Sequence, residues 1–105
     1  MAKKGGKNGR KSHRQDPVVR AAFARVLAEL RQDCKLKLHE VASASGYTEK
    51  YIGKLGRRIH TPTLTAVIFI SEALKADPRE VVERTLKLMP KFRHLERKDP
   101  EAADM

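Results

Sequence analysis

Three charged side chains within one short segment, Glu49, Lys50 and Lys54, have hydrogen-bonding groups that suit the edges of nucleic-acid bases. A lysine ammonium can donate to O6 and N7 of guanine, and a glutamate carboxylate can accept from N4 of cytosine. Lys50 and Lys54 are four residues apart, so in a helix they share one face, while Ile52 and Leu55 point inward. The lysines could also contact phosphate, or form an ordinary solvated basic face.

Further basic residues lie on both sides of this segment. Arg57, Arg58 and His60 follow it and could contact phosphate oxygens. The N-terminal residues 1–14 contain six basic residues and no acidic one: Lys3, Lys4, Lys7, Arg10, Lys11 and Arg14. A stretch of like charge with no apolar residue after Ala2 cannot offset its ordering entropy, so residues 1–15 should form a flexible arm. The arm could follow the phosphate backbone or enter a minor groove, or serve only as a solubilising tail.

The overall charge favours a polyanionic partner. A net charge of +10 and a pI near 10.1 indicate nucleic acid first and an anionic membrane surface second. Two tyrosines, three phenylalanines and no tryptophan are too few for a platform that stacks single-stranded bases. The longest apolar run, residues 66–70, is far shorter than the roughly 20 residues of a membrane span.

The remaining reactive residues do not suggest catalysis. Cys34 is the single cysteine, so no intramolecular disulfide is possible and a reducing cytoplasm is expected, with nucleoid association in a prokaryote. The four histidines and Cys34 lack the spacing of a zinc site. The glycines of residues 5–9 follow no strand and so do not resemble a phosphate-binding loop. We expect no metal, no cofactor, no small-molecule ligand and no enzymatic activity.

Five helices are predicted to position these groups in one all-α domain. Apolar residues at helical spacing predict helices over residues 17–33, 38–45, 48–55, 62–75 and 78–89. Asp16, Thr61 and Asp77 each precede a proline, which is the pattern of a helix N-cap followed by the first helical position. Residues 90–105 are highly charged and are predicted to form a C-terminal tail, which could be helical where it docks on the domain.

The second and third predicted helices have the features of a helix-turn-helix. Ala42 is small where two helices would touch, and Gly46 tolerates a positive φ in the turn. From Val19 to Met89 the chain resembles the lambda-repressor-like, Cro-type family, also called the xenobiotic-response-element family, of helix-turn-helix DNA-binding proteins. The matching residues are Leu36, Val41, Ala42, Gly46, Tyr47, Thr48, Ile52, Leu55, Pro62 and Leu64.

This resemblance implies a role for the helix at 48–55. In the family the corresponding helix lies in the DNA major groove, which implies base contacts by Glu49, Lys50, Tyr51 and Lys54. Phosphate contacts are expected from Lys37, Thr48, Arg57, Arg58 and His60. The chain departs from the family pattern at Lys37, where a capping hydroxyl is usual, at Leu38, where a phosphate-binding polar residue is common, and at Gly56 and Arg58, which replace an acidic residue and a glycine.

The fourth predicted helix is apolar nearly all round, which fits either core packing or a dimer interface. In the second case Phe69, Ile70, Val82, Leu86 and Met89 would meet a second copy. We therefore expect a sequence-specific, double-stranded-DNA-binding transcriptional regulator, most simply a homodimeric repressor of an inverted-repeat operator. The alternatives are a sequence-independent architectural DNA-binding protein and an antitoxin-like module that binds protein or RNA.

Overall fold

The computed structural model of the protein describes residues 16–97. The predicted N-terminal arm, with its six basic residues, and the last part of the predicted C-terminal tail lie outside this range. Between residues 16 and 97 the chain forms helices and no β-strand, which confirms the predicted all-α fold. The elements are α2 (Pro17–Cys34), α3 (Leu38–Ser45), α4 (Glu49–Gly56), α5 (Leu64–Ala73), α6 (Pro78–Leu88), the 3-10 helix η1 (Met89–Phe92) and α7 (His94–Arg97).

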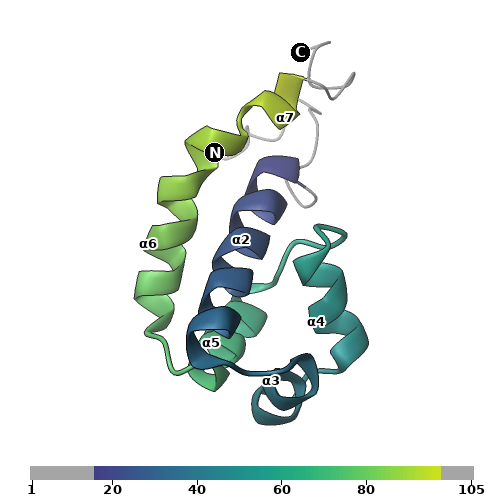
Figure 1. Ribbon diagram of the computed structural model, residues 1–105. Coiled ribbons are helices and arrows are strands. Elements are labelled where there is room, and N and C mark those ends of the chain that lie inside the picture. Colours follow the sequence, from purple (N-terminus) through teal and green to yellow (C-terminus); the bar gives the residue numbers. More distant parts are fainter. Residues whose placement is uncertain (1–15, 98–105) are drawn as a thin grey trace, which may run out of the picture.

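The long helix α2 is the centre of the fold (Figure 1). It packs against α6, η1 and α7 on one side and against α4 on the other. Helix α3 contacts α4 and α5, and α5 in turn contacts α6. The two helices of the predicted helix-turn-helix, α3 and α4, therefore lie together at one side of the molecule.

A single hydrophobic core joins these helices. Each helix from α2 to α6 contributes at least one buried apolar side chain to it, and the members include Phe23, Val26, Leu27, Leu30, Val41, Ala42, Ile52, Leu55, Ala66, Ile70, Leu74 and Val81. Burial of a Val, Leu, Ile or Phe side chain contributes about 1.5–3 kcal/mol. Short helices such as α3 and α4 are marginal in isolation, so this packing is what holds them in place.

Side-chain caps define where the helices begin. The Asp16 carboxylate accepts hydrogen bonds from the N–H groups of Val18 and Val19, at 2.8 and 3.0 Å. The cap predicted at Thr61 is wrong: Thr63 caps α5 instead, by accepting from the N–H of Ala66 at 3.0 Å. Both threonines carry a suitable hydroxyl, and α5 begins after the second one.

Residues 89–97 form two short helical segments beyond α6. Helices η1 and α7 continue from α6 and pack against α2. The Arg58 guanidinium lies 5.1 Å from the centre of the Phe92 ring, which is a cation–π contact between the loop after α4 and η1. An ion pair of 2.8 Å between Arg84 and Glu29 also ties α6 to α2. None of the helices described is both long and apolar enough to span a membrane.

Candidate nucleic-acid interface

The turn between α3 and α4 has the geometry that the sequence pattern required. Gly46 adopts a left-handed conformation, with φ 85° and ψ 6°, and its N–H donates to the carbonyl of Ala42 at 3.0 Å. No heavy atom lies within 4 Å of a Cβ built on Gly46. Backbone conformation rather than lack of space therefore favours glycine at this position. Ala42 is 6% exposed and packs in the core below the turn.

Helix α4 begins directly after this turn and presents charged side chains to solvent. The Thr48 hydroxyl caps it by accepting from the N–H of Tyr51 at 3.0 Å. Glu49 and Lys50, in its first turn, are exposed. Ile52 is 1% exposed and anchors the opposite side of the helix in the core. The first two residues of α4 are thus held in a fixed orientation and remain available to a ligand.

Lys54 and Tyr51 are less accessible to solvent than Glu49 and Lys50. Both are half-buried, and Tyr51 packs against the hydrophobic core. The Tyr51 ring stacks on Tyr47 and on His60, with centroid distances of 5.1 and 6.4 Å. This three-ring stack links the turn, α4 and the loop after it. Base reading by Tyr51 stays a prediction, and its packing gives it a structural role as well.

The phenol of Tyr51 reflects this partly buried environment. Burial raises the pKa of Tyr51 above its ordinary value, because the charged phenolate loses solvation. Hydrogen bonding with the backbone and side chain of Thr63 lowers the pKa, and the neighbouring Tyr47 raises it further, so that the pKa is raised overall. The contact with Thr63 also connects α4 to the N-terminus of α5.

Basic side chains surround the C-terminal end of α4. Arg57 and Arg58 are exposed, and His60 is half-buried within the aromatic stack. Arg58 has a left-handed backbone conformation, φ 65°, which turns the chain sharply away from the helix. The Arg57 side chain folds back over Gly53, since a Cβ on that glycine would lie 3.2 Å from Nη1 of Arg57.

Lys37, at the start of α3, does not act as a side-chain cap because an ammonium has no acceptor. The backbone N–H of Lys37 instead donates to the Glu40 carboxylate, at 2.7 Å. The backbone N–H of Lys37 is therefore satisfied at the start of α3, although position 37 has no capping hydroxyl. The Lys37 ammonium is left at the exposed surface, where it could meet a phosphate.

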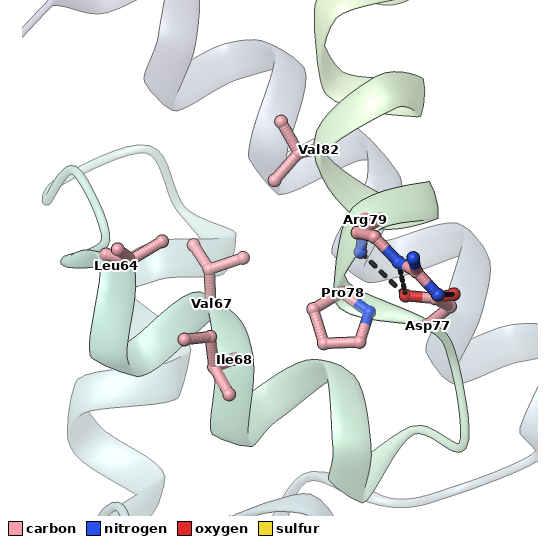
Figure 2. A pocket seen from close by; sticks show the side chains of 7 residues that line it. All are labelled: Leu64, Val67, Ile68, Asp77, Pro78, Arg79 and Val82. Atoms are coloured by element: carbon pink, nitrogen blue, oxygen red, sulfur yellow. Dashed lines mark hydrogen bonds and ion pairs between the residues drawn. The ribbon is translucent and has the colours of Figure 1, made fainter.

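A second surface lies between α5 and α6, around an apolar groove of about 580 Å³. In Figure 2, Leu64, Val67 and Ile68 of α5 face Val82 and Pro78 of α6 across this groove. A smaller cavity of about 220 Å³ shares Leu64, Val67 and Val82 and is also lined by Leu86 and Met89. Asp77 and Arg79 form an ion pair of 3.0 Å at the edge of the groove.

Of the residues predicted for a dimer interface, Val82, Leu86 and Met89 line the groove or the smaller cavity beside it, whereas Phe69 and Ile70 line neither. Phe69, Val82 and Leu86 are 48%, 42% and 60% exposed, and Met89 is half-buried. Ile70 is 1% exposed and belongs to the core, so its predicted place in an interface is wrong. Leu64 was not predicted for this surface, although it is 71% exposed. Its apolar spacing made it look like a core residue of α5.

The described residues offer no metal-binding centre. Within residues 16–97 no three His, Cys, Asp or Glu side chains gather where they could hold an ion. The thiol of Cys34 instead donates to the carbonyl of Leu74 at 3.0 Å, which joins the end of α2 to the end of α5.

Comparisons with known proteins give one informative result. No protein-family model matches the chain, and no curated protein matches it, so its resemblance to the Cro-type family stays a prediction. The structure is similar to a crystal structure described as the clp gene regulator ClgR from Corynebacterium glutamicum. The TM-score is 0.68 and the sequence identity 25%, over 77% of this chain and 86% of that one. The helical arrangement is thus one that a gene regulator also has.

Proposed function

We propose that this protein is a DNA-binding transcriptional regulator that places α4 in the major groove. The observation that carries the proposal is the first turn of α4, where Glu49 and Lys50 are exposed while Ile52 is buried behind them. A helix held in this way can enter the major groove, with its N-terminal residues at the base edges. The structural similarity to a gene regulator supports the same function.

Contacts to phosphate would hold α4 in register on the duplex. Arg57 and Arg58 are exposed at one end of the helix, and Thr48 and Lys37 are exposed near the other. His60 is fixed by its stacking on Tyr51. Such contacts position a protein without carrying sequence information. The basic residues of the N-terminal arm would add affinity that depends steeply on salt.

We also propose that the regulator works as a homodimer that represses transcription from an inverted repeat. The exposed apolar residues of α5 and α6, including Leu64, Val82 and Leu86, support a subunit interface. Dimers of helix-turn-helix proteins read two half-sites about 34 Å apart. A dimer bound at a promoter can repress by blocking the access of polymerase.

The test is fluorescence anisotropy with two labelled duplexes, one from upstream of the protein's own gene and one with the same bases scrambled. Titrations are made at several salt concentrations around 150 mM, with the full chain and with residues 2–14 deleted. A regulator of its own promoter should prefer the upstream duplex by about 10³-fold or more. The deletion should flatten the slope of log K against log salt, since each neutralised phosphate contributes about −0.9.

The other outcomes separate the alternatives. If the upstream duplex gives no preference, duplexes selected from genomic fragments are tested next. Equal affinity for selected and scrambled duplexes would contradict specific regulation and indicate an architectural DNA-binding protein. Absence of binding to any duplex would contradict the proposal and direct the search to protein and RNA partners.

A further inference from the structure

A cavity of about 300 Å³ lies between α2, α3 and α4, behind the proposed DNA-contacting residues. Its lining is almost wholly apolar, apart from two arginines. The apolar part consists of Ala24, Leu27, Ala28, Leu38, Ile52, Gly53 and Gly56, and the arginines are Arg31 of α2 and Arg57, which directly follows α4.

Arg31 has an unmet hydrogen-bonding requirement. Its Nε is buried and makes no hydrogen bond. A buried donor without an acceptor costs free energy, and native structures rarely leave one in this condition. Among the ion pairs of residues 16–97, none involves Arg31 or Arg57. Two guanidinium groups therefore line one cavity without a carboxylate from the described part of the chain.

The cavity opens to solvent at Gly56, which is exposed and has no heavy atom within 4 Å of a Cβ built on it. The Arg57 guanidinium covers Gly53. Its Nη1 lies 3.2 Å from the point where a Cβ on Gly53 would be. The Arg57 guanidinium is at the end of a flexible side chain, so it can move toward a ligand at little cost in free energy.

We propose that this cavity binds a small organic carboxylate with an apolar body. The planar guanidinium fork matches the two oxygens of a carboxylate, and such a charge-assisted hydrogen bond is stronger than one between neutral groups. The apolar lining would leave the hydroxyl groups of a sugar or nucleotide unsatisfied, but it suits a hydrocarbon chain or ring. A volume of about 300 Å³ is at the lower end of the range for ligand pockets, which fits a small molecule.

Occupation of this cavity has a consequence for DNA binding, and this part rests on the proposed function. A carboxylate that pairs with Arg57 withdraws a positive charge from the phosphate-contacting end of α4. The ligand would therefore weaken DNA binding, as an inducer does.

The experiment is an NMR titration of the full ¹⁵N-labelled chain with hexanoate, compared with uncharged hexanamide and with acetate at the same ionic strength. We expect saturable shifts of the Gly53 and Gly56 amides and of the Arg31 Nε–H signal with hexanoate. Hexanamide and acetate should bind at least about tenfold more weakly, because one lacks the charge and the other the apolar body.

Two variants on α2 make the test specific. Arg31→Met keeps an apolar stem of similar length and should weaken hexanoate binding by at least about tenfold. Arg25→Met, at an exposed position of the same helix, should leave it unchanged. Equal shifts with hexanoate and hexanamide, no shift at either glycine, or full binding to Arg31→Met would each overturn the proposal. The titration contains no DNA, so its result is independent of whether the protein is a regulator.

Discussion

The exposure of Lys50 and the burial of Ile52 follow from the same helical spacing. Residues two positions apart in a helix point to nearly opposite sides, so an inward Ile52 leaves Lys50 outward. This much was predictable from the sequence alone. The stacking of Tyr51 on His60 was not, because it depends on the path of the loop between α4 and α5. Nor did any sequence pattern single out Arg31. Its buried Nε without a hydrogen-bond partner becomes apparent only when α2 and α4 are packed together.

At the same scale, Asp77 gives a prediction about pH. Hydrogen bonds from the side chain and backbone of Arg79 lower the pKa of Asp77 below its ordinary value. A group whose pKa is lower in the folded state stabilises that state above its unfolded pKa, and the contribution is lost as pH falls through the folded value.

We therefore expect the melting temperature of the wild type to exceed that of Asp77→Asn at neutral pH, with the difference shrinking as pH falls from about 4 toward 2. Asparagine still offers a capping oxygen but carries no charge. Circular dichroism melts of both proteins across this range give the measurement. A difference that stays constant with pH would show that the carboxylate charge makes no contribution.

At the scale of elements, two glycines of the helix-turn-helix should respond in opposite ways to alanine. Gly46 has φ 85°, so Gly46→Ala should lower the unfolding free energy by about 1–2 kcal/mol. Gly53 lies inside α4, and Gly53→Ala should raise the unfolding free energy by up to about 1 kcal/mol. The Arg57 side chain, 3.2 Å from the new Cβ, is flexible enough to move aside.

Urea unfolding of the two variants and the wild type measures both effects in one series. The two substitutions serve as each other's control, because both add one methyl group and lie seven residues apart in the same motif. If Gly46→Ala and Gly53→Ala lowered the unfolding free energy equally, the packing around α4 would require a glycine at position 53, and the prediction would be wrong.

Helix positions were easier to predict than helix ends. The apolar periodicity indicated each of the five helices from α2 to α6, because their buried stripes are regular. The start of α5 was misplaced, since Thr61 and Thr63 carry the same capping group and only the structure selects Thr63. The bounds of η1 and α7 were not predicted, although helix formation on docking was allowed for, because these segments depend on packing against α2 and on the contact of Arg58 with Phe92.

At the scale of the whole molecule, the apolar surface of α5 and α6 leads to a prediction about assembly. If it is a subunit interface, Leu86→Glu should convert a dimer to a monomer with little effect on folding, because Leu86 is 60% exposed. Ile59→Glu, at another exposed apolar position, should leave the dimer intact. Sedimentation equilibrium of the three proteins measures the change. A wild-type chain that is monomeric at high micromolar concentration would contradict the proposed homodimer.

The division between core and surface in this region was only partly predictable. Helix α5 is apolar on nearly every side, so the sequence could not separate Ile70, which is buried, from Phe69, which is 48% exposed. The difference arises from which neighbours pack against α5, namely α3 and α6. Three-dimensional packing was therefore needed to define the groove at Leu64 and Val82.

The central claim, that α4 reads DNA bases, is tested most directly by comparing Lys50→Ala with Arg57→Ala. The measured quantity is the ratio of affinities for a cognate and a scrambled duplex at one salt concentration. Lys50→Ala should lower this ratio by about 5- to 150-fold, because a base contact contributes about 1–3 kcal/mol of discrimination. Arg57→Ala should weaken binding to both duplexes alike and leave the ratio unchanged. If both substitutions weaken both duplexes equally, α4 is not the helix that reads the bases.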